Sequence, residues 1–377
     1  MTIDGLSPAR VLQPGSIEEL SEVMTSAGSV VAVGAGTQQH FGNPLQRFDS
    51  AINLTKLNRI TEYVPADLTI HVEAGVTLQT LAKTLADNNQ FVPLDPWNGP
   101  AATIGGIAAA NAQGPFRAAG TIRDWIIGMK VVEASGRISK TGGRVVKNVT
   151  GYDLAKLYTG SIGSLAIIAE VSLKVRAKYG KTATAVAQFE NEEKVHQALS
   201  AIRTGPLQPV ACEWAGPEHE LWLRFGDQPK AVDWQLRNLP AGDWKVFENA
   251  DEANAWESLR VRYCTLGPIV LKVVGLPSAM SEVIKDCRPS SWIAHALNGV
   301  VFVSVSSAAD VTRTRKNHRA VIERAPLGLR RQVATFGLND AEYELMRRMK
   351  TAFDPEGRLS PGRHVDGERG AERAVKE

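Results

Sequence analysis

The stretch that most constrains the fold is Gly142–Val175, which changes character along its length. Residues 142–151 are polar and contain several glycines, which predicts a loop. Asp153 is a good N-cap for a short helix that the sequence Gly-Ser-Ile-Gly at 160–163 then ends. Ser164–Val175 is too apolar for a half-exposed strand and belongs in a core. Backbone N–H groups can meet here without bulky side chains, which suits a phosphate-bearing or aromatic ligand.

A second glycine-bearing loop lies near the start of the chain. Ser29–Val33 predicts a short buried strand, and Gly34-Ala-Gly-Thr-Gln-Gln39 follows it directly. The loop lacks the third glycine of a GxGxxG turn, and Asn43-Pro44 prevents a long helix, so a nicotinamide site is not expected. It also lacks the Gly-Lys-Ser/Thr of a Walker loop. The loop either lays N–H groups on a pyrophosphate or simply joins two strands.

A third segment of small residues spans 101–114. Only a segment packed closely against a flat ligand or against backbone needs so little side-chain bulk. Thr103, Gly105 and Gly106 could open a half-helix whose N-terminus faces anionic oxygens. A small-residue helix packed tightly on a sheet accounts for the pattern equally well.

The rest of the first 178 residues predicts mixed helices and strands. Ser16 and Glu19 form a capping-box pattern before an amphipathic helix that ends near Ala27. Thr77 caps a second helix, and Ser135-Gly136 predicts the turn of a hairpin. We expect strands at 51–54, 60–64, 69–73, 125–134 and 137–140, and a helix at 78–87.

The pattern changes after Lys178, where tryptophans become frequent and the segments are mixed. We expect an α+β domain over 179–338, with helices at 191–202 and 308–324. Its expected strands are 210–214, 221–225, 269–274 and 300–305. A helix over 340–353 lies in a C-terminal segment, 339–365, and the charged residues 366–377 are expected to be disordered.

Composition narrows the function classes. A net charge of +3 gives no reason to expect nucleic acid as a partner, and no apolar run is long enough to cross a membrane. The three cysteines, Cys212, Cys264 and Cys287, form no CxxC pair, so the chain is expected to carry no zinc or iron–sulfur ligand set. The first residues do not predict a signal peptide, and we expect a cytoplasmic protein, at the membrane only through partners.

Three segments in this order resemble the FAD-binding domain of the vanillyl-alcohol-oxidase and para-cresol-methylhydroxylase (PCMH) superfamily. They are Val33–Gln38, Ala102–Ile107 and Asn148–Leu154 continued by Gly160–Leu165. Within it, Arg144–Asp153 and the tail Phe353–Arg363 resemble the FAD-binding subunits of bacterial glycolate oxidases. The resemblance implies a PCMH-type domain of two α+β subdomains over 1–178, a smaller α+β cap domain, and a tail that returns to the FAD domain.

The resemblance also implies which residues hold the cofactor. The first loop matches a pyrophosphate loop, the second segment lies under the flavin, and the third loop and strand approach the adenine. The implied FAD-binding residues are Gly34, Ala35, Gly36, Thr37, Gln38, Asp95, Pro96, Thr103, Gly105, Gly106, Ala109, Asp153, Gly160, Ser161, Gly163 and Ile168. Covalent relatives often place histidine where Thr37 stands, so FAD is expected to be non-covalent, with His40 structural.

The implied function is that of an FAD subunit of a glycolate-oxidase-type complex acting on a small 2-hydroxy acid. A second flavoprotein subunit and an iron–sulfur subunit are the implied partners. No catalytic residue is assigned, because His196, His219, His295, His318 and His364 form no HxxxH cluster. Arg262, Arg363 and His364 are either candidates to approach the flavin or plain structural charges. A self-sufficient FAD oxidoreductase and a non-catalytic scaffold subunit stay open as alternatives.

Overall fold

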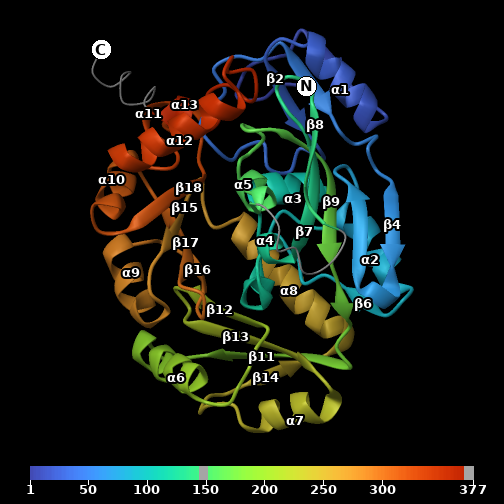
Figure 1. The fold of residues 1–377 in the computed structure, drawn as a ribbon. Helices are drawn as coiled ribbons and strands as arrows, with labels where there is room; N and C mark the ends of the chain where they lie inside the picture. The colour runs from blue at the N-terminus through green and yellow to red at the C-terminus, as the bar shows by residue number, and fades with distance from the viewer. Residues whose placement is uncertain (144–151, 369–377) are drawn as a thin grey trace. The chain divides into compact units, whose positions relative to one another are not determined.

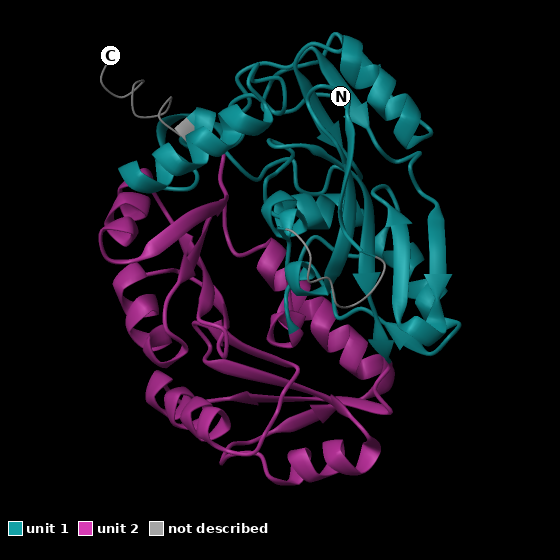
Figure 2. Ribbon diagram, in the orientation of Figure 1, with its two compact units in different colours: residues 1–113, 120–177, 327–377 teal, residues 114–119, 178–326 magenta. Residues whose placement is uncertain are grey.

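The computed structural model describes residues 1–143 and 152–368. The chain divides into two compact units (Figure 2). Unit 1 combines residues 1–113, 120–177 and 327–377, and unit 2 combines residues 114–119 and 178–326. Most of the predicted loop 142–151, including the Asn148–Gly151 part of the third motif, lies outside the described residues. Both units mix helices with sheets, which confirms the predicted α+β class.

Unit 1 begins with a parallel sheet in the order β1-β3-β2, formed by Arg10–Leu12, Ser50–Asn53 and Val30–Val33 (Figure 1). Helix α1, Ile17–Ser26, buries Leu20 and Met24 beside it. Ser16 caps this helix by accepting the N–H of Glu19 at 3.1 Å. The Glu19 carboxylate accepts the N–H of Gly15 at 2.8 Å, so the predicted capping box is displaced by one residue.

A five-stranded antiparallel sheet in the order β4-β5-β9-β7-β8 forms the larger core of unit 1. Its central strand β9, Ile167–Lys174, is buried on both faces over all but its last residue, which explains its continuous apolar sequence. The other strands are Ile60–Val64 (β4), Thr69–Glu73 (β5), Ile126–Val132 (β7) and Ile138–Gly142 (β8).

Short helices connect these strands. Thr77 caps α2, Leu78–Ala86, by accepting the N–H of Thr80 at 3.1 Å. The remaining elements of this part of unit 1 are α3 (Ile104–Ala110), α4 (Ile122–Trp125), α5 (Leu154–Tyr158), the 3-10 turn η1 (Pro65–Asp67), and the strand pair β6 (Gln90–Phe91) and β10 (Arg176–Ala177).

The C-terminal segment completes unit 1 with α11 (Leu327–Gln332), α12 (Asp340–Phe353) and α13 (Val365–Glu368). After α12 the tail runs along β2: Val30 N–H donates to the Arg358 carbonyl, and Ser360 N–H donates to the Val30 carbonyl, both at 2.8 Å. The tail therefore packs along β2 through a single parallel β-bridge between Val30 and Leu359. Residues 366–368, expected to be disordered, lie in α13.

Unit 2 is built on an antiparallel eight-stranded sheet in the order β14-β11-β13-β12-β16-β17-β15-β18. The strands are Lys181–Gln188 (β11), Ala211–Gly216 (β12), Glu220–Asp227 (β13), Lys245–Phe247 (β14), Ile269–Val274 (β15), Trp292–His295 (β16), Val300–Val305 (β17) and Arg319–Arg324 (β18). The helices are Glu192–Thr204 (α6), Pro229–Arg237 (α7), Asn249–Cys264 (α8), Met280–Cys287 (α9) and Ala308–Asn317 (α10), with 3-10 turns at Pro115–Ala119 (η2) and Pro277–Ala279 (η3).

The predicted helix over 308–324 is wrong in its second half. Helix α10 ends at Asn317, and Arg319–Arg324 forms strand β18, which pairs with β15. The alternation of buried Ala320 and Ile322 with more exposed neighbours has the period of a strand. The edge of β15 supplies the backbone partners that make this choice favourable.

Three of the six tryptophans of unit 2 lie in its core. Trp214, Trp222 and Trp292 are at most 8% exposed, and the rings of Trp214 and Trp292 meet edge to face at 6.1 Å. Trp234 is 42% exposed. These three buried tryptophans therefore contribute to the packing of unit 2.

Candidate functional site

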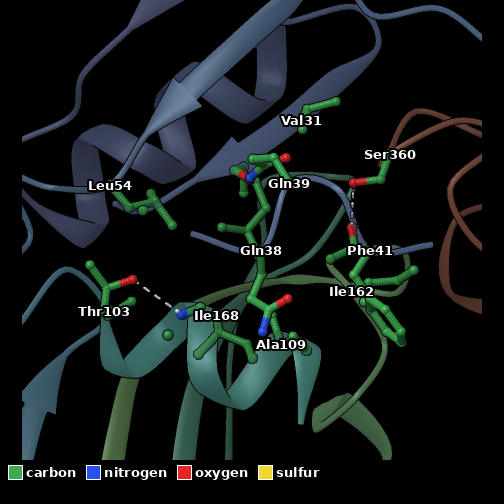
Figure 3. Close-up of a pocket in the computed structure, with 18 of the residues that line it drawn as sticks. Val31, Gln38, Gln39, Phe41, Leu54, Thr103, Ala109, Ile162, Ile168 and Ser360 are labelled. Atoms are coloured by element: carbon green, nitrogen blue, oxygen red, sulfur yellow. Dashed lines mark hydrogen bonds between the residues drawn. The ribbon is translucent and has the colours of Figure 1, made fainter. Parts of the chain in front are cut away.

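A pocket that is partly open to solvent lies within unit 1 (Figure 3). It is enclosed by the loop after β2, the start of α3, the turn before β9, the first residues of β9, and the C-terminal tail. Gln38 extends from the first loop toward Ala109 on α3 (Figure 3).

Two glycines are required by close approach around this cavity. A Cβ atom at Gly34 would overlap the Thr103 hydroxyl. A Cβ atom at Gly105 would lie 2.5 Å from the Cβ of Ala74 and 2.9 Å from its carbonyl oxygen. The loop, helix α3 and the end of β5 can therefore meet only because these positions lack side chains.

The N-terminus of α3 does not present free N–H groups. The N–H of Ile104 donates to the Val76 carbonyl and the N–H of Gly105 to the Ala74 carbonyl, both at 2.8 Å. The Gly106 N–H donates to Thr103 Oγ1 at 3.3 Å. We expected the N–H groups of this terminus to face the anionic oxygens of a ligand. That expectation is wrong, because these N–H groups donate to acceptors within the chain. What the structure shows is the alternative, a small-residue helix packed on a sheet.

The turn at 160–163 also donates N–H groups to α3. Gly160 and Ile162 donate their N–H groups to the carbonyls of Ala108 and Ala109, at 2.9 and 2.8 Å. These bonds satisfy the C-terminal carbonyls of the helix and fix the turn against it. Gly163, with a φ of +70°, then brings the backbone to the cavity wall.

The first loop differs from the other two. Within the described ranges, the N–H groups of Ala35, Gly36 and Thr37 donate no hydrogen bond to the chain. The loop is held instead through a side chain, because Asn98 Nδ2 donates to Thr37 Oγ1 at 2.8 Å. The buried Oε1 of Gln38 also has no hydrogen-bond partner. This loop keeps donors and an acceptor available for a ligand.

The cavity brings together half of the candidate residues. Those that line it are Gly34, Gln38, Thr103, Gly105, Gly106, Ala109, Gly163 and Ile168. Those outside the lining are Ala35, Gly36, Thr37, Asp95, Pro96, Asp153, Gly160 and Ser161. Asp153 makes no capping bond to α5 and pairs with Lys156 at 3.3 Å on the surface.

On the tail side of the cavity, Ser360 and Arg363 form part of the wall. The sequence analysis named Arg363 as a candidate to approach the flavin, but it did not point to Ser360. The signal for Ser360 was the Leu-Ser-Pro-Gly-Arg sequence at 359–363, which lies in the tail that carried the family resemblance. The neighbouring His364 is partly buried, and this burial lowers its pKa to about 4.

Other candidate groups lie in unit 2. Arg262 forms ion pairs with Glu218 and Glu220 on β13 and its preceding turn. His295 Nδ1 lies 2.7 Å from Glu213 Oε1 in the core, and burial lowers the His295 pKa to about 3, so the ring is neutral. Across 1–143 and 152–368 no three His, Cys, Asp or Glu side chains gather into a metal-binding group, and no helix is long and apolar enough to span a membrane.

Comparison with known families identifies the fold around the cavity. Residues 8–142 match the model of the FAD binding domain, and residues 328–364 match the model of the C-terminal domain of FAD linked oxidases. The chain is similar to FAD-linked oxidases in both segments, and these similarities support FAD as its cofactor.

Individual relatives narrow this family. The chain is 29% identical over 215 residues to glycolate oxidase subunit GlcE of Escherichia coli, covering 55% of this chain and 59% of the relative. It is 32% identical over 213 residues to glycolate oxidase subunit GlcD of Bacillus subtilis, covering 55% and 45%. The chain thus spans about half the length of these relatives. A D-lactate dehydrogenase of Archaeoglobus fulgidus is 25% identical over 94% of this chain and 91% of its own.

Solved structures show the same fold at low identity. A 4-ethylphenol oxidase from Gulosibacter chungangensis superposes with a TM-score of 0.69 at 16% identity, over 94% of this chain and 88% of that one. An alkyldihydroxyacetonephosphate synthase gives the same TM-score and identity, over 93% and 76%.

The cavity fits FAD by its own chemistry. Glycines at 34 and 105 allow main chain to approach, and the first loop offers unpaired N–H groups. Apolar side chains of Ile162, Ile167 and Ile168 offer a surface for a flat ring. FAD combines two phosphates with flat aromatic rings, which is the combination that such walls can bind.

Proposed function

We propose that this chain is an FAD-containing subunit of a glycolate-oxidase-type dehydrogenase that oxidises a small 2-hydroxy acid. FAD supplies the electron-accepting chemistry when bound. In this proposal a second flavoprotein subunit and an iron–sulfur subunit take the electrons onward, and the complex is cytoplasmic. The observation that carries it is the cavity of an FAD-linked oxidase in a chain similar to two glycolate oxidase subunits.

The proposed cofactor attachment is non-covalent, as Thr37 lies where covalent relatives often have histidine. The chain's own contribution is to orient the cofactor with the loop after β2, the α3 segment and the turn before β9. Gly34, Gly105 and Gly163 line the cavity, and the first two let the loop and α3 pack against Thr103 and Ala74.

The test is the absorbance spectrum of the purified chain before and after acid precipitation. Flavin released into the supernatant supports non-covalent FAD, and flavin that stays with the pellet contradicts it. A His40→Ala variant is the control for covalent attachment, because the exposed His40 is the histidine nearest to Thr37 in sequence. A chain that takes up no flavin even from added FAD contradicts the proposal.

Anaerobic addition of glycolate and of D-lactate to the FAD-loaded chain then identifies the donor. Bleaching by glycolate only after the partner subunits are added supports the proposed complex. The match to the D-lactate dehydrogenase over nearly the whole chain favours a second candidate, a self-sufficient 2-hydroxy acid dehydrogenase. Bleaching of the isolated chain by D-lactate would support that candidate, and bound flavin that no donor reduces, with partners present, would support a scaffold subunit.

A further inference from the structure

The tail contributes a cation to the wall of the cavity. Arg363 has a side chain only 4% exposed, and it is the single charged residue among the described residues that line this cavity. Its Nη1 lies 2.9 Å from Asp4 Oδ2. Its Nη2 is buried and has no hydrogen-bond partner. A buried guanidinium nitrogen without an acceptor is costly, so this group has capacity for a further acceptor.

The charges around Arg363 do not balance. Asp4 holds two buried arginines, because its Oδ1 also lies 2.5 Å from Arg330 Nη2. One carboxylate therefore faces two guanidinium groups, which leaves an excess of one positive charge next to the cavity. Neighbouring groups do not correct this, since Lys350 is paired with Asp354 at 2.6 Å and Asp366 lies at the surface.

The pKa of Arg363 is consistent with this excess positive charge. Burial is the main cause that lowers the pKa of Arg363 to about 10, and the like charge of Arg330 lowers it further while Asp4 raises it. An anion in the cavity would raise the pKa of Arg363 and so oppose the lowering by burial and by Arg330. The positive charge is therefore matched to a ligand with negative charge rather than to the protein alone.

Other donors near the cavity are mostly used. The first N–H groups of α3 and those of Gly160 and Ile162 bond within the chain. Ser360, on the same tail, donates its hydroxyl to the Gly163 carbonyl at 3.3 Å. The free N–H groups of the first loop and the Nη2 of Arg363 are thus available to bind anionic oxygens.

We propose that Arg363 binds a phosphate oxygen of FAD, and that Asp4 and Arg330 position it for this contact. The proposal rests on FAD as the ligand of this cavity. It makes cofactor affinity depend on both ends of the chain, because Asp4 comes from the N-terminal segment and Arg363 from the C-terminal tail. Asp4 and Arg330 are positioning residues, since each acts through Arg363.

The test compares ligands with and without phosphate. The full-length apoprotein is titrated with FAD by flavin fluorescence, and with ADP and adenosine by calorimetry. Arg363→Gln should weaken FAD and ADP by about 10- to 100-fold, as expected for loss of a hydrogen bond to a charged group, and leave adenosine unchanged. Arg347→Gln is the matched control, because it removes a cation from the exposed face of α12 and should change none of the three.

The outcomes separate this proposal from the assignment of FAD. Wild-type protein that binds FAD while Arg363→Gln binds it equally well overturns the role of Arg363 alone. Equal losses for ADP and adenosine also overturn it, since the phosphate would then not matter. Wild-type protein that binds neither FAD nor ADP overturns the FAD assignment and this role together.

A conservative variant covers the case in which Arg363→Gln does not fold. Arg363→Lys keeps the charge beside Asp4 but loses the forked donors, so FAD and ADP should bind about tenfold more weakly than to wild type. Wild-type affinity for FAD and ADP in this variant overturns the proposed contact. A parallel circular dichroism spectrum checks that each variant is folded.

Discussion

The cavity has two walls that are built on different principles. The wall made by the glycine loops is neutral, and its shape depends on absent side chains at Gly34 and Gly105. The wall made by the tail carries charge and depends on buried side chains, among them Arg363 and the Lys350–Asp354 pair behind it. The comparison teaches that local motifs can set the shape of a ligand site while distant segments supply its charge.

The largest expected effect comes from a substitution that destabilises the tail wall of the cavity. Lys350 Nζ donates to Asp354 Oδ2 at 2.6 Å, to the Ser164 carbonyl at 2.9 Å and to the Leu359 carbonyl at 2.8 Å. Lys350→Met leaves the Asp354 carboxylate buried without its cation, which should destabilise unit 1 by about 3–5 kcal/mol. Urea unfolding followed by fluorescence measures this. Lys156→Met, on the exposed pair with Asp153, is the control and should cost about 0.5 kcal/mol or less.

A loss in Lys350→Met no larger than in Lys156→Met would show that the tail is not held by this pair. The tail would then depend on its backbone bonds to β2 alone.

The next effect tests whether the tail wall responds to pH. Burial lowers the His364 pKa in the folded chain to about 4, below the ordinary 6.5. The unfolded chain therefore binds more protons between these values, and stability must fall as the pH falls from about 6.5 to 4. Two and a half pKa units correspond to about 3 kcal/mol at most.

The measurement is the unfolding midpoint of wild type and His364→Asn at pH 7 and at pH 4.5. The variant should lose less stability on acidification than wild type does. His295 titrates with the same sign in unit 2 and is present in both proteins, so it cancels in the difference. Parallel pH profiles would contradict the buried neutral state of His364.

A smaller effect breaks the loop wall. Gly105→Val would place Cβ 2.5 Å from the Cβ of Ala74, and overpacking of this kind costs about 1–3 kcal/mol. The displaced α3 should also release FAD, which flavin fluorescence detects. Gly328→Ala is the control, because nothing lies within 4 Å of that position and it should be neutral or slightly stabilising. FAD retention by Gly105→Val at wild-type affinity would show that α3 need not contact β5 closely.

The smallest effect comes from backbone conformation at a position where an added side chain would meet no neighbour. Gly36 has a φ of +77°, and no atom lies within 4 Å of the point where a Cβ would be, so Gly36→Ala meets no steric neighbour. The substitution should cost about 1–2 kcal/mol from the left-handed backbone alone. Thermal unfolding measures this cost, and a variant as stable as wild type would mean that the loop adjusts freely.

Much of the fold followed from local patterns. The strands 60–64 and 69–73, the helix cap at Thr77 and the buried strand before Val175 were predicted because their periodicity and capping residues lie within a few neighbours. The 308–324 segment failed because strand β18 depends on the edge of β15, which the local sequence does not contain. Pairing with a distant strand outweighed a helical composition.

The candidate site followed the same division. Gly34, Gly105 and Gly163 were predicted as cofactor-binding residues from the family motifs, and they line the cavity. The N–H groups of α3 were assigned to a ligand incorrectly, because their acceptors, Ala74 and Val76, come from another element. Hydrogen-bond partners between elements cannot be counted from local sequence.

The sequence by itself determined the small-residue loops, the buried strand that follows the last of them and, through its family motifs, the FAD-binding class of the cavity. Only the tertiary structure decided which backbone donors stay free and that Asp4, Arg330 and Arg363 meet beside the cavity. The physical reason is range. Backbone conformation depends on neighbours in sequence, whereas the balance of buried charge depends on residues that only folding brings together.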